Sequence, residues 1–261
     1  MERGKFVAVY GANNLGKSTA LKGLEERLKC DGWTVLRVKY PDYSLPKGIR
    51  INAYLRLGNP EGLTADQAQD LYAQNRWERQ PALLADLGRG VTVLAEDYVG
   101  TGMCWGQALG VTLKKLIDYN QGLLKPDLAI LLDGNRFVSG IEPGHKLESD
   151  SQKWNEVRRL HQELAMRERW YVVGANQEPS KVVDDLMMVF DGVLVGYEGP
   201  KPFCFDLPRI RGVSVGSVEK NLSCFREVCT RPWADCNYRI KGLGDQNEWR
   251  RCADKPRRKL D

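Results

Sequence analysis

A glycine-rich segment near the N-terminus constrains the chain more than any other feature. Residues 11–19 read GANNLGKST, which satisfies the pattern G-x-x-x-x-G-K-[ST], and they directly follow the apolar run Lys5–Tyr10. Leu21, Leu24 and Leu28 then recur at helical spacing, so the segment joins a predicted strand to a predicted helix. In this position, glycines let the backbone wrap around a phosphate, and amides at the helix N-terminus supply positive potential. The sequence therefore predicts a nucleotide-binding loop.

The same loop indicates which residues contact ATP and its phosphates. Lys17 is the first predicted catalytic residue, because its ammonium reaches the β- and γ-phosphates from this position. The Ser18 hydroxyl can bind Mg²⁺, and Glu96 follows the apolar segment 91–95, where a carboxylate can reach the same ion. Ser18 and Glu96 are therefore the predicted metal site, although Glu96 also fits an ordinary polar residue at a strand end. The predicted contacts with ATP are Gly11, Asn13, Asn14, Leu15, Gly16, Lys17, Ser18 and Thr19.

Short apolar segments alternate along the chain with segments of helical periodicity. The predicted strands, apolar on both faces as buried parallel strands are, are Lys5–Tyr10, Thr34–Lys39, Val91–Ala95, Leu128–Leu132 and Trp170–Val173. The predicted helices are Lys17–Cys30, Thr64–Leu87, Gly106–Tyr119 and Ser151–Arg169, and Thr64 to Gln67 match a helix start signal. This alternation predicts a doubly wound α/β domain. Residues 134–150, rich in Gly, Pro and charge, are predicted to form a loop over the carboxyl edge of the sheet.

Length and composition exclude several classes of protein. The chain has 261 residues, of which 42% are hydrophobic and 28% charged, which is typical of a globular protein with one main domain. Its apolar runs fall well short of the roughly 18 residues that span a membrane, and its N-terminus lacks a secretory pattern. The seven cysteines, an odd number, do not suggest a disulfide framework. We therefore expect a cytoplasmic protein with reduced thiols and no membrane partner.

The basic charge of the chain is concentrated at its C-terminal end. Residues 201–261 hold 14 Lys and Arg against 8 Asp and Glu, a net charge of +6. Trp233, Tyr238 and Trp249 alternate there with arginines, a combination that binds single-stranded nucleic acid but also occurs in a small capping subdomain or a solvated basic terminus. Four cysteines could bind zinc or be ordinary thiols, since they lack the paired C-x₂-C spacing of strong zinc motifs. They are Cys224, Cys229, Cys236 and Cys252.

Four further motifs follow the phosphate loop in a fixed order. Residues 71–78 read LYAQNRWE and are the most specific of the four. The others are Tyr40-Pro41, residues 96–107 (EDYVGTGMCWGQ) and residues 125–128 (KPDL). Together with the phosphate loop, these motifs resemble the thymidylate kinase family over roughly residues 5–190.

The resemblance implies a three-layer P-loop kinase fold with a five-stranded parallel sheet over residues 1–198, followed by a small C-terminal extension, residues 199–261. It implies ATP with Mg²⁺ as the donor and a nucleoside monophosphate as the acceptor. Family members often form homodimers, although nothing in the sequence pattern shows an interface.

The resemblance also suggests an acceptor pocket. By position, Tyr72 would stack on the acceptor base, Arg76 would hydrogen-bond to it, and Trp105 and Gln107 would line the same pocket. A stacking aromatic ring and a donor fork suit a flat, polar base. Without the motif, the aromatic residues would indicate core packing and Arg76 a charge on a helix surface.

The chain departs from the family where positive charge is expected. Asn13 replaces an acidic residue of the phosphate loop, and Tyr43 and Asp97 stand where two arginines would face the acceptor phosphate. Tyr43 remains a predicted substrate contact. Asp97 is a predicted catalytic residue that would either repel an acceptor phosphate or serve as a base. Arg136 and Lys146, the candidate cations of the predicted lid, complete the predicted catalytic residues.

These departures leave three functions open. In the first, the protein phosphorylates a deoxynucleoside monophosphate, and Lys39, Lys47 or Arg50 replaces the missing arginines. In the second, it phosphorylates a hydroxyl on a modified base or nucleotide within DNA, with the basic extension binding the nucleic acid. In the third, it binds ATP without transferring a phosphoryl group. We expect the first of these functions.

Overall fold

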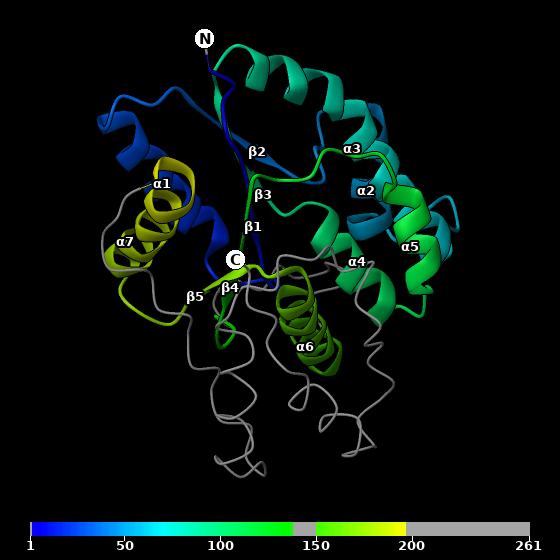
Figure 1. Cartoon of the computed structure of the whole chain (residues 1–261). Helices are drawn as coiled ribbons and strands as arrows, with labels where there is room; N and C mark the ends of the chain where they lie inside the picture. Colours follow the sequence, from blue (N-terminus) through cyan, green and yellow to red (C-terminus); the bar gives the residue numbers. More distant parts are fainter. Residues whose placement is uncertain (1, 138–149, 197–261) are drawn as a thin grey trace, which may run out of the picture. The chain divides into compact units, whose positions relative to one another are not determined.

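The computed structural model describes residues 2–137 and 150–196, which form an α/β domain around one sheet (Figure 1). The strand order is β2-β3-β1-β4-β5, and every pair of neighbouring strands is parallel. This arrangement confirms the predicted five-stranded parallel sheet. The strands are β1 Phe6–Tyr10, β2 Val35–Lys39, β3 Thr92–Glu96, β4 Leu128–Asp133 and β5 Tyr171–Gly174.

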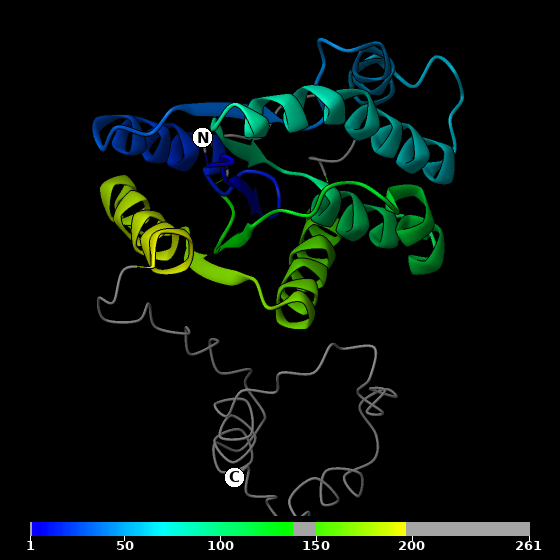
Figure 2. The same cartoon turned by 45° about the horizontal axis from the view of Figure 1, so that its top comes forward.

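Helices cover both faces of this sheet, which gives the three layers that the resemblance implied. In both views α1 lies beside α7 on one side of the sheet, and α3 runs along the other side (Figures 1 and 2). The helices are α1 Lys17–Cys30, α2 Pro46–Arg56, α3 Ala65–Gly88, α4 Val99–Ala108, α5 Leu113–Asn120, α6 Ser151–Glu168 and α7 Pro179–Phe190, with a π-helical turn, η2, at Asp191–Val195.

The central strand β1 is buried along its whole length. Its alternate residues point to opposite faces of the sheet, and helices cover both faces. Val7 and Val9 belong to the same hydrophobic cluster as the α1 leucines 21, 24 and 28. Phe6, Ala8 and Tyr10 belong to the cluster that contains Leu83 and Leu87 of α3. The apolar character of β1 on both faces therefore places it at the centre of the sheet, and the loop that follows it lies at the carboxyl edge.

One predicted helix is wrong, because residues 106–119 form the end of α4 and the whole of α5. The chain turns at Gly110, which has a φ of 85°, a left-handed conformation that glycine adopts without strain. The amides of Leu109 and Val111 bond back to Gly106 O at 3.2 and 2.9 Å and end α4 there. The periodicity of the apolar residues continues across this turn, so the sequence pattern hid the break.

Helix starts were easier to predict where side chains cap the helix. Thr64 accepts a hydrogen bond from the Gln67 amide and Gln67 accepts one from the Thr64 amide, so the predicted start of α3 is confirmed. Helices α2 and α7 were not predicted. Helix α2 begins at Pro46, a residue that suits the first turn of a helix, but Gly48 follows closely and weakens the helical pattern.

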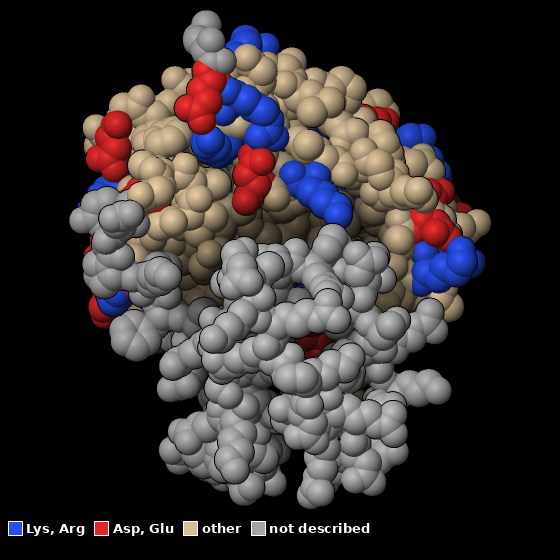
Figure 3. Space-filling model, viewed as in Figure 1, with Lys and Arg blue, Asp and Glu red and all other residues tan. Residues whose placement is uncertain are grey.

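Cationic and anionic side chains lie next to one another on the face of the molecule in Figure 3. Among the described residues, Arg3 pairs with Asp127 at 2.8 Å, and Arg158 pairs with Asp133 at 2.7 Å. Within residues 2–137 and 150–196, no helix combines the length and apolar character of a membrane span. Two earlier predictions, the lid cation Lys146 and the basic extension 199–261 with its cysteines and nucleic-acid contact, lie outside the described residues.

Candidate active site

The phosphate loop owes its shape to residues with unusual backbone conformations. Gly11 has a φ of 147°, and a Cβ there would lie 2.4 Å from the Leu132 carbonyl oxygen of β4. Gly16, with a φ of 76°, precedes α1 in a left-handed conformation, and Asn14, with a φ of 62°, shares it. Because only glycine combines a missing Cβ with free access to positive φ, the two glycines let the loop turn tightly over β4 before α1 begins.

Lys17 lies inside this loop and is only 6% exposed. Its ammonium donates to the carbonyl oxygens of Gly11 and Ala12 at 2.9 and 3.0 Å. The same nitrogen lies 3.6 Å from an Asp97 carboxylate oxygen. The structure therefore holds the predicted catalytic lysine at the centre of the loop, with its charge balanced by a carboxylate from the end of β3.

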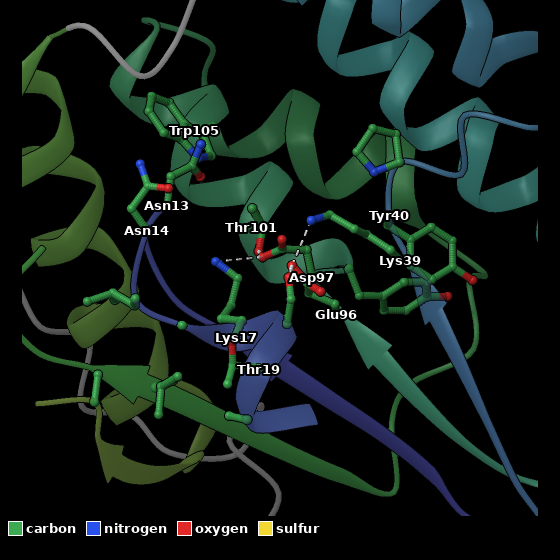
Figure 4. A pocket seen from close by; sticks show the side chains of 18 of the residues that line it. Asn13, Asn14, Lys17, Thr19, Lys39, Tyr40, Glu96, Asp97, Thr101 and Trp105 are labelled. Atoms are coloured by element: carbon green, nitrogen blue, oxygen red, sulfur yellow. Dashed lines mark hydrogen bonds and ion pairs between the residues drawn. The ribbon is translucent and has the colours of Figure 1, made fainter. Parts of the chain in front are cut away.

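Glu96 and Lys39 lie beside this lysine (Figure 4), and Ser18 bonds to Glu96. The Ser18 hydroxyl donates to Glu96 Oε1 at 2.8 Å, and the Lys39 ammonium lies 2.8 Å from the same oxygen. Lys39 ends β2 and Glu96 ends β3, and the two residues are paired in the register of these strands. Because parallel strands end at the same edge, the fold brings the two predicted metal ligands together with a cation that the phosphate-loop motif does not specify.

Asp97 follows β3 in a left-handed conformation with a φ of 62°. Its Oδ1 accepts a hydrogen bond of 2.7 Å from the Thr101 hydroxyl of α4. Burial raises the pKa of the Asp97 carboxyl, while the Lys17 charge lowers it and the Glu96 charge raises it. The Asp97 carboxylate thus lies between Lys17 and Thr101 of α4, as Figure 4 shows. Lys17 balances its charge, and Thr101 donates a hydrogen bond to it.

Helices α3 and α4 position the predicted residues of the acceptor pocket. Tyr72 and Arg76 lie one turn apart on α3, and Trp105 of α4 lines the same cavity. Arg76 is 3% exposed, and its Nη1 donates to the Tyr72 carbonyl oxygen at 3.2 Å. Its Nη2 has no hydrogen-bond partner among the residues that the structure describes. Burial lowers the pKa of Arg76 from its ordinary value. A buried guanidinium with an unpaired nitrogen is a strong donor site for a ligand oxygen.

Arg56 is a site residue that the sequence motifs did not indicate. Its Nη1 donates to the Tyr43 hydroxyl at 3.1 Å and to Asn52 Oδ1 at 3.0 Å, and its Cζ lies 5.1 Å from the Tyr43 ring centroid. Tyr43 stands where the family has an arginine, and Arg56 of α2 packs against its ring. Sequence reasoning missed Arg56 because this arginine is the last residue of α2, a helix that was not predicted.

A single cavity of about 560 Å³ connects the phosphate loop with these residues. Its lining includes Asn13, Asn14, Leu15, Gly16, Lys17, Ser18, Thr19, Lys39, Tyr43, Arg56, Gln69, Tyr72, Arg76, Glu96, Asp97, Thr101, Gly102 and Trp105. Three predicted site residues within the described ranges do not line it, namely Gly11, Gln107 and Arg136. Gln107 donates instead to the Met103 carbonyl oxygen within α4 at 3.1 Å, and Arg136 lies over the Trp154 ring, 5.9 Å from its centroid.

Known proteins resemble this chain in sequence and in fold. The family model of thymidylate kinase matches residues 9–186, which is most of the chain. The chain belongs to the thymidylate kinase family. It is therefore an ATP-dependent nucleotide kinase that phosphorylates a nucleoside monophosphate, and the alternative of a kinase acting on DNA is not favoured.

Individual members of the family are distant relatives of this chain. The thymidylate kinase of Dictyostelium discoideum is 25% identical over 198 residues, which are 73% of this chain and 86% of that protein. The thymidylate kinase of Homo sapiens is 24% identical over 74% of this chain and 92% of its own length. The solved structure of thymidylate kinase from Candida albicans has a TM-score of 0.64 at 23% identity and covers 73% of this chain. That structural likeness supports the fold.

Proposed function

We propose that this kinase transfers the γ-phosphoryl group of Mg²⁺-ATP to thymidylate. The supporting observation is the continuous cavity, because it joins Lys17 and Ser18 of the phosphate loop to Tyr72 and Arg76 of the aromatic pocket. Phosphoryl transfer depends mainly on bringing donor and acceptor into line and on stabilising the charge that moves between them. A cavity with a phosphate site at one end and a base site at the other meets the first requirement.

Ser18 and Glu96 would hold Mg²⁺ in this proposal. Their oxygens are 2.8 Å apart, and a hydroxyl with a carboxylate is the kind of hard oxygen pair that Mg²⁺ prefers alongside phosphates and water. When bound, the ion would supply positive charge that neutralises part of the charge of the ATP phosphates. Lys39 lies against the same Glu96 oxygen and adds a second positive charge there.

Lys39 and Arg56 would supply the positive charge that the two missing arginines supply in the family. Both line the cavity, whereas Lys47 and Arg50, the other expected replacements, do not, and Arg50 pairs with Glu61 at 2.6 Å. Asp97, which was expected either to repel the acceptor phosphate or to serve as a base, lies beside Lys17 and accepts a hydrogen bond from Thr101. Its charge would therefore steady Lys17 between the loop carbonyls and the transferred group.

A panel of phosphoryl acceptors tests this function. Purified protein is incubated with γ-labelled ATP and Mg²⁺ and with each of the four deoxynucleoside monophosphates, or with DNA containing normal or modified bases. We expect label in thymidine diphosphate, with the other monophosphates labelled more slowly. Label that enters only DNA, or label that enters no acceptor while ATP still binds, would exclude the proposed acceptor.

Gly102→Ala is expected to weaken acceptor binding without removing catalysis. A Cβ at Gly102 would lie 2.3 Å from Arg76 Nη2, so the buried guanidinium has to move away from the cavity. Losing one hydrogen bond from a charged donor raises the KM for thymidylate by roughly tenfold or more, while the KM for ATP changes little. Steady-state kinetics with each substrate varied in turn measures this. Equal changes in both KM values would indicate a general loss of structure instead.

A further inference from the structure

Gln69 lies on the same face of α3 as the two predicted base contacts. It precedes Tyr72 by three residues and Arg76 by seven, a spacing that aligns side chains along one stripe of a helix. All three side chains line the cavity together with Trp105 of α4. The sequence motif that pointed to Tyr72 and Arg76 begins at residue 71, so it did not include this glutamine.

The Gln69 side chain lines the cavity without a protein partner for its amide. The residue is 3% exposed, and within residues 2–137 and 150–196 its amide makes no hydrogen bond to the protein. Buried amides are almost always hydrogen-bonded, so an unpaired one that lines a cavity indicates a ligand. The Gln69 amide is therefore available to a ligand in the cavity that Tyr72 and Trp105 also line.

The Gln69 side chain packs close to a glycine of α4. A Cβ at Gly106 would lie 2.5 Å from Leu116 Cδ2 and 3.2 Å from Gln69 Cγ, so Leu116 and the glutamine together occupy the space beside position 106. Gln107, the amide that the sequence predicted here, turns back onto its own helix and bonds to Met103 O. The cavity thus receives its amide from α3, across Gly106, instead of from α4.

We infer that Gln69 determines acceptor specificity by reading the imide edge of the base, an inference that rests on the proposed function. Arg76 can only donate, so it suits a ring carbonyl. A glutamine amide both accepts and donates, so its oxygen can accept a hydrogen bond from a ring N–H and its nitrogen can donate one to a neighbouring carbonyl. Thymine and uracil present a carbonyl next to an N–H. Cytosine presents an amine where Arg76 needs an acceptor.

The test compares two glutamines and two acceptors. Gln69→Ala and the matched control Gln107→Ala are assayed with thymidylate and with its N3-methyl analogue, which lacks the ring N–H. We expect the KM of Gln69→Ala for thymidylate to rise roughly 5- to 100-fold, the effect of leaving one buried polar group unpaired. The KM for the analogue should change less, because the analogue has no N–H to leave unpaired. The ratio of the two KM values, which measures the preference for thymidylate, should therefore fall toward one. Gln107→Ala is expected to keep the wild-type preference.

Gln69→Met guards against a loss of structure, because methionine keeps the volume of glutamine and removes only the amide. Melting temperatures and the KM for ATP should stay near wild type in this variant, while the KM for thymidylate rises. If both Gln69 variants keep the wild-type preference, or if Gln107→Ala loses it, the inference is wrong although the proposed function stands. If wild-type protein phosphorylates no free monophosphate, the proposed function fails first.

Discussion

Lys17→Ala is expected to lower kcat for phosphoryl transfer on the order of 10²- to 10³-fold or more, the effect of removing one preorganised donor from the transferring group. The Lys17 ammonium lies between the carbonyls of Gly11 and Ala12 and is 6% exposed, so no solvent-borne cation takes its place. Label transfer from ATP to thymidylate at saturating concentrations of both measures the loss. Asp97 also loses its ion pair, so the melting temperature should fall by a few degrees.

Lys22→Ala is the matched control for this experiment. Lys22 belongs to the same helix, but it is 67% exposed and lies 3.9 Å from Glu26 on the helix surface. Exposed pairs of this kind contribute little, so activity and melting temperature should both stay near wild type. If Lys17→Ala retains kcat within tenfold of wild type while remaining folded, the phosphate loop does not carry the chemistry and the assigned role of Lys17 is wrong.

Gly48→Ala is expected to lower the stability of the protein more than any other added methyl group near Tyr43 and Arg56. A Cβ at Gly48 of α2 would lie 1.8 Å from Asp42 O and 2.8 Å from Tyr43 Cα, which are backbone atoms. That backbone is fixed, because the Asn75 side chain accepts from the Asp42 amide at 2.8 Å and donates to the Asp42 carbonyl at 3.0 Å. Overpacking against a fixed backbone costs about 1–3 kcal/mol or more of unfolding free energy.

The displacement also has a kinetic consequence. Tyr43 precedes α2 and Arg56 ends it, so moving the helix separates the pair that lines the acceptor side. We expect the melting temperature of Gly48→Ala to fall by roughly 3–10 °C, with a raised KM for thymidylate. Gly88→Ala is the control, since a Cβ there meets nothing within 4 Å and should stabilise α3 slightly. Equal melting temperatures for the two variants would contradict the predicted clash.

The loss of two arginines changes how this kinase would neutralise its acceptor. Arg56 reaches the cavity from the far end of α2 and lies against Tyr43, so the positive charge arrives from another element at nearly the same place. Asp97, by contrast, forms part of the phosphate-loop charge balance through Lys17. We infer that the two substitutions have different consequences. At position 43, where Tyr43 replaces an arginine, the positive charge comes instead from Arg56. At position 97, the arginine is replaced by Asp97, which pairs with the catalytic lysine Lys17.

Much of the fold was determined by local sequence. The order of the strands, helices α1, α3 and α6, the phosphate loop and the start of α3 follow from apolar periodicity, from glycines that permit positive φ, and from a capping pair. Each of these signals acts within a few residues along the chain, so a sequence read locally contains it. The break at Gly110 was missed because apolar spacing continues across the turn.

The tertiary structure decided which side chains meet. Gln69 and Gln107 are both glutamines on helices beside the pocket, yet Gln69 lines the cavity and Gln107 bonds to its own helix. Arg56 reaches Tyr43 across thirteen residues, and Lys39 reaches Glu96 because their strands are neighbours in the sheet. Sequence spacing fixes where a residue lies along its own element, whereas helix rotation and strand order fix what it faces. Those depend on packing between distant segments, which the sequence does not show locally.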